Sequence, residues 1–433
     1  MSDTTGLVTI DLTPASWFVA LTVAYYAALF VLAHRRPAPP AGGATPLMVL
    51  VVPAHQEESV LAATLASLTA LHYGGEHRVL VVDDGSTDAT GTIADAWAAR
   101  DPRVRVTHRR PPDAGLGKSE ALNHGFGLVS RWAAAGDPWL GDHALEDVVL
   151  VIVDADGRLD PEALTTVAPY FADPRVASVQ IGVRIANARD NALARMQDIE
   201  FVGFSWLVQI ARDRLGSSGL GGNGQFTRAS ALASLGVAPW RPGALTEDLD
   251  LGLRLVAAGW RTRFCWAAHV EQQGLTSWRP LLRQRTRWIQ GHYQCWRHLG
   301  ALVGARRVAW TARADLALYL LLVVTVLVVS ATVVVGLLGA LGVVGVTNDL
   351  LLAVPYGRPR RLASLVLSVL PVVVFLRTYQ RHSAHPFRWW QVPAAAVAFT
   401  GYGYMWFWVS LRALGNIALR RNRWVKTPRV GAA

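Results

Sequence analysis

The sequence has few of the residues that stabilise small secreted domains, since Cys265 and Cys295 are its only cysteines among 433 residues. Two isolated cysteines provide neither a disulfide framework nor a zinc site. We therefore expect two reduced thiols in a cytosolic domain. Charge is also sparse, because charged residues make up 17% of the chain and hydrophobic residues 52%. A mean hydropathy of +0.26 is high for a soluble protein, so the composition predicts membrane segments.

Several nucleotide and metal motifs are missing. No G-x-G-x-x-G follows the first apolar strand, and no G-x-x-x-x-G-K-[ST] occurs. These absences argue against a dinucleotide-binding fold and a P-loop enzyme. His269, His292 and His298 lack the spacing of an H-E-x-x-H helix, so we expect them to be structural rather than metal ligands.

Acidic charge is the scarcer sign, since 42 basic and 31 acidic residues give a net charge of +11. The basic residues gather beside the apolar runs, with Arg35-Arg36 after the first run and Arg306, Arg307 and Arg313 before the second. This placement follows the positive-inside rule and indicates contact with anionic lipid. We therefore do not expect nucleic acid as a partner.

Long apolar runs lie near the two ends of the chain. Residues 17–33 nearly reach the length that crosses a bilayer, and Asp3 and Asp11 before them do not fit a signal peptide. We expect an uncleaved anchor with the N-terminus outside and Arg35-Arg36 in the cytoplasm. Three further spans are expected at residues 316–346, 362–376 and 392–411.

With four spans, the basic stretch that begins at Arg420 would lie on the outer face, although basic residues favour the inner one. Five spans therefore stay open as an alternative. A hairpin over residues 316–356 supplies the fifth span but places Asn348-Asp349 within it, which is costly. The expected divisions are an anchor (1–36), a linker (37–46), a cytoplasmic α/β domain (47–280), interfacial amphipathic helices (281–312), C-terminal transmembrane helices (313–415) and a basic tail (416–433).

The central part of the chain predicts an α/β sheet. Residues 48–53, 79–82 and 148–153 are continuous apolar runs, as in parallel strands that are covered on both faces. Helical patterns at 59–70, 89–100 and 119–129 complete a β-α-β alternation. Ligands bind such sheets beyond the carboxyl ends of the strands. The site is therefore expected among the residues that follow these runs.

Acidic residues follow two of the runs: Asp83-Asp84 after the second, and Asp154 with Asp156 after the third. Plain strand-end turns are the alternative explanation, because Asp and Gly are common there. Two neighbouring acidic strand ends favour a site. Asp154 and Asp156 suit Mg²⁺ or Mn²⁺ bridging two phosphates of a nucleotide, and Asp84 suits hydrogen bonds from uracil or ribose.

Glycine-rich segments predict two more parts of the site. Gly115-Leu116-Gly117-Lys118 places a lysine at a helix start, where it can pair with a phosphate. A solvated surface lysine is the alternative. Gly221-Gly222-Asn223-Gly224-Gln225 is a loop that permits close approach of the backbone to a ligand.

Two later motifs point to catalysis at a surface. Thr246-Glu247-Asp248-Leu249-Asp250 begins an amphipathic helix, and capping explains an acid there but not three. One carboxylate can act as a general base. Gln284-Arg285-Thr286-Arg287-Trp288 fits a basic helix at the membrane surface. It also fits a site in which Arg285 or Arg287 neutralises a leaving diphosphate while Trp288 stacks on a sugar ring.

In this order, the motifs resemble those of membrane-embedded family 2 glycosyltransferases, such as cellulose, chitin, hyaluronan and poly-N-acetylglucosamine synthases. The resemblance covers about residues 47–296, and the set is specific although each motif alone is weak. The motifs are Val52-Pro53-Ala54-His55-Gln56-Glu57-Glu58, Asp83-Asp84-Gly85-Ser86-Thr87-Asp88, Gly117-Lys118-Ser119-Glu120-Ala121-Leu122-Asn123, Asp154-Ala155-Asp156-Gly157, Thr246-Glu247-Asp248 and Gln284-Arg285-Thr286-Arg287-Trp288. It implies a GT-A fold with a Rossmann-like, mixed but mostly parallel sheet, and inverting transfer.

The resemblance also implies roles for single residues. Asp248, beside Glu247, would be the general base, and Asp156 would ligate Mg²⁺ or Mn²⁺. The donor would be held by Ala54, Glu57, Asp84, Lys118, Asp154, Asp156, Arg285 and Arg287. The acceptor would meet Gln284, Trp288, Asn223, Gly224 and Gln225. His55-Gln56 departs from the family's usual Tyr-Asn, which affects the contacts expected with the base.

We therefore predict inverting, metal-dependent transfer from UDP-GlcNAc or UDP-glucose to a growing β-linked polysaccharide by a multi-pass plasma-membrane protein. About four spans are fewer than cellulose or hyaluronan synthases have. Single-sugar transfer to a lipid acceptor, such as a polyprenyl phosphate or glycolipid, is the alternative. A non-enzymatic membrane protein with a nucleotide-sensing domain is a remote one. An accessory or export protein is a further expected partner.

Overall fold

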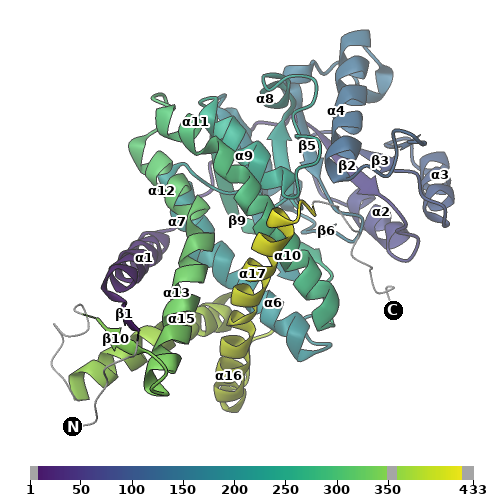
Figure 1. Cartoon of the computed structure of the whole chain (residues 1–433). Coiled ribbons are helices and arrows are strands. Elements are labelled where there is room, and N and C mark those ends of the chain that lie inside the picture. Colours follow the sequence, from purple (N-terminus) through teal and green to yellow (C-terminus); the bar gives the residue numbers. More distant parts are fainter. Residues whose placement is uncertain (1–7, 349–357, 422–433) are drawn as a thin grey trace, which may run out of the picture.

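The computed structural model describes residues 8–348 and 358–421 of the chain (Figure 1). Its centre is an eight-stranded sheet in the order β4-β3-β2-β5-β8-β7-β9-β6. The strands are β2 (Leu47–Ala54), β3 (His77–Asp83), β4 (Val104–His108), β5 (Val148–Ile152), β6 (Arg158–Leu159), β7 (Val176–Ile185), β8 (Gln225–Arg228) and β9 (Arg261–Gln272). The three apolar runs of the sequence form β2, β3 and β5, as predicted.

The sheet is mixed and mostly parallel. β4, β3, β2 and β5 are parallel neighbours, β8 runs antiparallel to both β5 and β7, and β9 is parallel to β7. The carboxyl ends of β2, β3 and β5 therefore meet at one edge, which is where a ligand binds in sheets of this kind.

Helices cover both faces of the sheet, because successive side chains of a strand point to opposite sides. Met48, Leu50 and Val52 of β2 pack with α2 (Leu61–Thr69) and α3 (Thr90–Arg100). Leu47, Val49 and Val51 pack with α4 (Lys118–Ala135) on the other face. The three predicted helices are therefore present. Figure 1 shows α2, α3 and α4 around one end of the sheet.

The remaining helices follow the central strands. They are α5 (Ala163–Val167), α6 (Ala192–Gly203), α7 (Ile210–Leu215), α8 (Ala229–Ala233), α9 (Glu247–Ala257), α10 (Trp278–Gln294), α11 (Leu299–Gly304), α12 (Trp310–Leu320), α13 (Leu322–Ala340), α15 (Arg358–His382), α16 (Val392–Gly403) and α17 (Met405–Ala418). A π-helical turn, 204–209, joins α6 to α7. The α/β part ends with β9, and α10 begins close to the predicted interfacial segment.

Apolar helices gather on the side of the molecule opposite α2, α3 and α4 (Figure 1). α1 (Thr13–Ala33) lies against α13, where the Thr22 and Thr325 hydroxyl oxygens are 3.4 Å apart. Just before α1, the short strand β1 (Thr9–Asp11) pairs with β10 (Gly345–Thr347), which follows α13. The start of α1 and the end of α13 are thus joined, so the two helices run antiparallel.

Two helices in the described residues are long and apolar enough to cross a membrane, Thr13–Ala33 and Leu322–Gly339. Their apolar side chains are largely exposed, among them Leu21, Val31 and Leu337. Each corresponds to a predicted span. The predicted run 392–411 instead divides into α16 and α17, and α17 lies along α10 through buried Met405, Val409 and Ala413 (Figure 1). A multi-pass topology with four or five spans stays a prediction.

Parts of the predicted topology lie outside the described residues. Asp349, on which the five-span alternative turned, is one of them, and so is most of the basic tail. The predicted run 362–376 falls within α15, which carries Pro371.

Candidate active site

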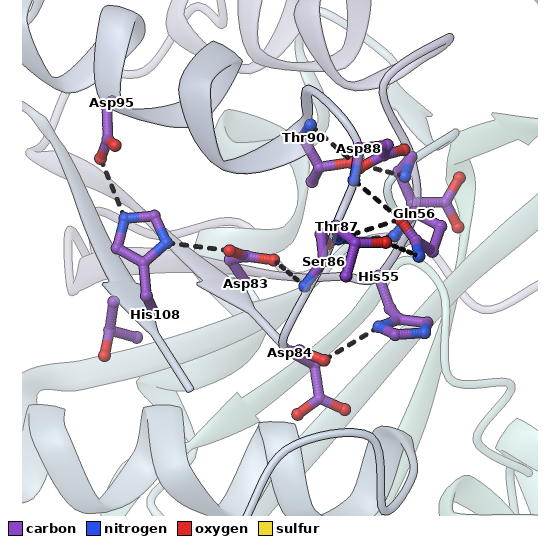
Figure 2. Close-up of polar contacts among 12 residues, drawn as sticks. His55, Gln56, Asp83, Asp84, Ser86, Thr87, Asp88, Thr90, Asp95 and His108 are labelled. Atoms are coloured by element: carbon purple, nitrogen blue, oxygen red, sulfur yellow. Dashed lines mark hydrogen bonds and ion pairs between the residues drawn. The ribbon is translucent and has the colours of Figure 1, made fainter. Parts of the chain in front are cut away.

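The turn after β3 is built by Asp83 (Figure 2). Its Oδ1 accepts a hydrogen bond of 3.0 Å from the backbone N–H of Ser86, and its Oδ2 lies 2.8 Å from Nδ1 of His108. Asp83 first, together with Asp95, raises the pKa of His108 against the effect of burial. These contacts give Asp83 a structural role.

Asp84 faces a different way from Asp83 (Figure 2). Its carboxylate pairs with the Arg109 guanidinium, and both side chains are buried. Its backbone N–H donates to the Ala54 carbonyl at 2.8 Å, so the ends of β2 and β3 are tied together. Its carbonyl lies 2.9 Å from Nδ1 of His55. The predicted donor residues Ala54 and Asp84 are therefore neighbours, and Arg109 is an added cation.

The segment after β2 lies against this turn. The Gln56 side chain accepts from the backbone of Thr87 and Asp88 and donates to the Thr87 hydroxyl at 2.8 Å (Figure 2). The Glu57 backbone N–H donates to the Thr90 hydroxyl at 2.7 Å, and the Glu57 side chain is buried. Gln56 thus holds the turn in place.

Lys118 contacts three segments that are far apart in the sequence. Its Nζ donates to Asp154 Oδ1 at 2.5 Å and to the Gly222 carbonyl at 3.1 Å, and it lies 3.6 Å from Glu247 Oε1. Burial disfavours its charge, but Asp154, Glu247 and Asp248 together raise the pKa of Lys118 to about 12. Lys118 is therefore a fixed cation inside the acidic cluster, not a solvated surface lysine.

Asp248 is the acid of this cluster that resists ionisation. Burial first, and the Glu247 charge second, raise the pKa of Asp248 to about 7. The Leu249 backbone N–H donates to its Oδ1 at 2.8 Å, and Lys118 and Arg287 oppose the rise. A carboxylate poised near neutral pH is suited to act as a general base. Asp248 and Glu247 lie together at the start of α9, as predicted from their spacing.

The third acid of this motif has a different role. Asp250 is buried, and its Oδ1 lies 2.7 Å from Nε2 of His298 and 3.5 Å from Nε of Arg241. Arg254, one turn later on α9, lies 3.8 Å from Oδ2. These contacts hold α9 in place, so only two of the three acids belong to the site.

The loop before β8 must be glycine-rich for the cluster to form. Gly222 has a φ of +73°, and a Cβ there would lie 3.1 Å from Asp248 Oδ2 and 3.4 Å from Lys118 Nζ. Asn223 accepts the Asp154 backbone N–H at 3.1 Å and donates to Gln272 Oε1 at 3.0 Å. The predicted loop therefore reaches the cluster through Gly222 and Asn223.

Gln225, predicted to meet the acceptor with Asn223 and Gly224, lies in the sheet core. It is fully buried, and its Nε2 donates to the Thr227 hydroxyl at 2.9 Å. Gly224 has a φ of +66° and packs so closely that a Cβ would meet Ile181 at 2.7 Å. Both residues therefore shape the loop from within.

The two arginines of the basic motif point to different places. Arg287 donates to the Leu245 carbonyl at 2.9 Å and lowers the pKa of Asp248, which puts it beside the acidic pair. Arg285 has other partners than those predicted. Its fully buried guanidinium donates to Glu200 Oε2 at 2.9 Å and to the Tyr402 hydroxyl at 3.3 Å, joining α10 to α6 and α16.

Trp288 belongs to the same structural group as Arg285. The Arg285 guanidinium carbon lies 3.9 Å from the Trp288 ring centre, and Phe201 meets the ring edge-on at 6.2 Å. Trp288 is partly exposed, as is Gln284, so each retains a face for a ligand. Their predicted acceptor contacts stay predictions.

The carboxylates of the site decide whether it can hold a divalent cation. Within the described ranges, no group of three or more His, Cys, Asp or Glu side chains forms a metal site. Asp156 is buried beyond β5, and its Oδ2 accepts the Gln273 backbone N–H at 3.1 Å. Mg²⁺ and similar ions bind through one or two carboxylates together with substrate phosphates and water. Asp156 with a bound diphosphate fits that pattern.

The sequence reasoning missed Arg109. Arg109 follows β4 directly, so its position at a strand end was the available signal. Gln180 is buried in β7; it accepts the Gly221 backbone N–H at 2.8 Å and donates to the Asn223 carbonyl at 2.8 Å. It thereby supports the loop that carries Gly222.

A mixed α/β sheet with an acidic edge, a half-buried lysine and a carboxyl whose pKa lies near 7 fits a nucleotide-sugar transferase. Residues 46–291 match the family described as "Glycosyltransferase like family 2". The chain belongs to this family and is a glycosyltransferase, which decides against the non-enzymatic alternative.

Two relatives carry the same name, "Beta-monoglucosyldiacylglycerol synthase". The one from Synechocystis sp. is 32% identical over 281 residues, which are 64% of this chain and 54% of the relative. The one from Nostoc sp. is 29% identical over 402 residues, which are 90% of this chain and 78% of the relative. The chain thus spans little more than half of the first relative. Both names refer to a glucosylated diacylglycerol, whereas the sequence predicted a polysaccharide product.

The fold is also that of a solved mannosyltransferase. The structure of "Mannosyltransferase PcManGT from Pyrobaculum calidifontis in complex with GDP-Man and Mn2+" matches with a TM-score of 0.57 and 17% identity. The match covers 90% of this chain and 98% of that one. The predicted GT-A-like α/β fold is therefore confirmed.

Proposed function

We propose that this glycosyltransferase transfers a single glucose from UDP-glucose to diacylglycerol or a closely related lipid at a membrane surface. The observation that carries the proposal is the similarity to the Nostoc relative, which extends over 90% of the chain and so beyond the α/β part. The product in that relative's name is a lipid with one sugar. The prediction of single-sugar transfer to a lipid thus becomes the main proposal.

The placement of the candidate base supports a lipid acceptor. Asp248 lies at the start of α9, and Leu253 and Val256 of that helix share one buried apolar cluster with Leu316 and Leu320 of α12. α12 leads directly into α13, one of the two helices apolar enough to cross a membrane. A hydroxyl that projects from the bilayer surface beside α12 is therefore near the base.

The roles of the side chains follow from their surroundings. Asp248 takes the proton from the acceptor hydroxyl as its oxygen attacks the anomeric carbon. Burial first, and the Glu247 charge second, keep the pKa of Asp248 high enough for that transfer. Arg287 and Lys118 offset negative charge on the leaving diphosphate. Asp84 and Ala54 hold the nucleoside at the ends of β3 and β2.

Mg²⁺ or Mn²⁺, held by Asp156 and the donor's phosphates, would add positive charge to the leaving diphosphate. Its other oxygen ligands would come from the donor itself and from water.

The test is a product analysis with membranes that contain the chain, UDP-glucose, Mn²⁺ and dioleoylglycerol. We expect UDP release with one lipid product that carries one hexose by mass spectrometry. The variant Asp248→Asn should still bind UDP-glucose but lose transfer, while Asp250→Asn tests an acid of the same helix outside the site. A product ladder, or undiminished transfer by Asp248→Asn, contradicts the proposal.

Chain extension is the second candidate, because the motif from Gln284 to Trp288 is typical of polysaccharide synthases in this family. The partly exposed Trp288 is where an acceptor sugar would stack. Radiolabelled UDP-GlcNAc and UDP-glucose, offered without lipid, should yield no polymer if lipid transfer is the function. The predicted accessory or export protein belongs with this second candidate.

A further inference from the structure

The C-terminal ends of α1 and α15 meet at one place on the α/β part. α1 ends at Ala33 and is followed by Arg35 and Arg36, and α15 ends with Arg381 and His382. The Arg36 Nη2 lies 3.3 Å from the His382 Nε2, although the two residues are far apart in sequence. Basic residues from both helix ends therefore share one small region.

Two tryptophans of the α/β part form the floor of this region. The His382 ring stacks on Trp206 with ring centres 3.7 Å apart and an angle of 10°. The Arg36 guanidinium carbon lies 4.3 Å from the Trp206 ring centre and 5.6 Å from that of Trp266. Trp266 donates to the Pro37 carbonyl at 2.9 Å, which fixes the chain just after α1. The region is thus held together by specific contacts.

A hollow beside these rings brings in a third arginine. Trp206, Trp266, Arg184, Ser205 and His269 are among the residues that line it. Arg36, Arg381 and Arg184 all lower the pKa of His382, after the larger effect of burial, so their charges act on the same ring.

The surrounding carboxylates serve other groups. Asp160 and Glu271 lie 3.2 and 3.9 Å from the His269 ring nitrogens. Among the described residues, no carboxylate lies within ion-pair distance of Arg36, Arg184 or Arg381. Three arginines thus lie around His382 without a carboxylate at ion-pair distance, although the charge of Arg184 also acts on the buried Asp198 carboxyl.

We propose that this region binds the phosphate of an anionic phospholipid headgroup. It is called the α1–α15 basic pocket and consists of the hollow lined by Arg184, Trp206 and Trp266 together with the neighbouring Arg36 and Arg381. The position of the pocket beside a candidate membrane span favours a lipid over a soluble anion. Arg36 comes three residues after the last residue of that span. Arginine and tryptophan are residues that favour the headgroup layer. Bound lipid would hold the α/β part against the leaflet. The inference goes beyond the proposed function and holds for either acceptor.

The test compares lipid binding in variants by native mass spectrometry of the detergent-purified full chain. The probes are phosphatidylglycerol and phosphatidylcholine with identical acyl chains. We expect one phosphatidylglycerol to bind saturably and in preference to phosphatidylcholine. The variant Arg36→Gln with Arg381→Gln should bind it about 30-fold more weakly, at about fivefold per arginine near a charged membrane surface.

The matched control is Arg306→Gln with Arg307→Gln, which removes the same charge from two exposed arginines just before α12. It should change phosphatidylglycerol binding less than about threefold, and Arg36→Lys with Arg381→Lys should largely retain it. Unaltered UDP binding by the glutamine variant at Arg36 and Arg381 shows that it is folded.

Three results would overturn the proposal. The control pair weakens binding as much as the test pair, which means a diffuse surface effect. Inorganic phosphate at millimolar concentration displaces the lipid, which means a site for soluble anions. Lastly, the test variant binds phosphatidylglycerol as the natural chain does.

Discussion

Replacing Glu247 by Gln should move the pH dependence of transfer to lower pH. The pKa of Asp248 is raised from 3.8 to about 7, so ionisation is opposed by about 4 kcal/mol. Burial is the larger cause and the Glu247 charge the second. A neutral Gln removes only the second cause, which we expect to lower the pKa of Asp248 by about one unit.

The sign follows from the role of the base. In the proposed mechanism ionised Asp248 accepts the proton, so kcat/KM for the acceptor should fall as the pH drops below about 7 in the natural chain. In Glu247→Gln, this acid limb should lie about one pH unit lower. The position of the limb is the readout, because Glu247 also lies 3.6 Å from Lys118 and its loss will lower the rate itself.

The assay is UDP release between pH 5.5 and 8.5 at saturating donor and metal. Glu146→Gln is the matched control, since Glu146 is exposed at the surface and its removal should leave the limb unchanged. An acid limb at the same pH in Glu247→Gln and in the natural chain would refute the coupling of the two carboxylates.

Stability provides an independent check of the same shift. Because the folded pKa of Asp248 lies above the unfolded value, the folded chain holds a proton that the unfolded chain releases between pH 3.8 and about 7. Stability from this group therefore falls as the pH rises through that window. Asp248→Asn should raise the unfolding temperature at pH 8 and have little effect near pH 4. A lower unfolding temperature for this variant at pH 8 would contradict the burial of an unfavourable charge.

Three other substitutions test separate parts of the site. Arg285→Met should cost about 3 kcal/mol of stability, seen as a lower unfolding temperature, because it breaks a buried ion pair. The control Arg283→Met changes an exposed arginine and should cost little. Gly222→Ala should lower kcat at least about tenfold by pushing on Asp248, while Gly243→Ala, with a similar φ and open space, should lose only about 1 kcal/mol of stability. Asp156→Asn should raise the Mn²⁺ concentration for half-maximal UDP release at least about tenfold, without raising the KM for the lipid.

The sheet could be predicted where the sequence forms continuous apolar runs. Residues of β2, β3 and β5 are buried on both faces, and this leaves a pattern that no polar residue interrupts. β7 and β9 were not predicted, because their polar residues are paired inside the fold. Ser178 of β7 donates to the Phe226 carbonyl at 2.7 Å, and Arg263 of β9 donates to Asp213 at 2.7 Å. Such partners come from distant segments and leave no local periodicity.

The sequence motifs could predict where the candidate site residues lie. They could not predict which side chains each of these residues contacts. Asp84, Lys118, Asp154 and Asp248 all follow strands or begin helices, so their location depends only on local order. Which of two arginines in one motif faces the acids depends on helical phase and on what covers each face. Arg285 is covered by α6 and α16, and the sequence gives no sign of Glu200 as its partner.

Buried arginines join the catalytic part to the apolar helices at two separate points. Arg212 of α7 pairs with Asp315 of α12 at 2.9 Å, and Asp315 also accepts from Tyr25 of α1 at 2.7 Å. Arg285 of α10 pairs with Glu200, which also accepts from Tyr402 of α16. Each group is an arginine, a carboxylate and a tyrosine from three elements. Since a buried pair is costly to break singly, we expect the helices and the acidic pair to move as one body, which under the proposed function would keep Asp248 at a constant distance from the lipid acceptor.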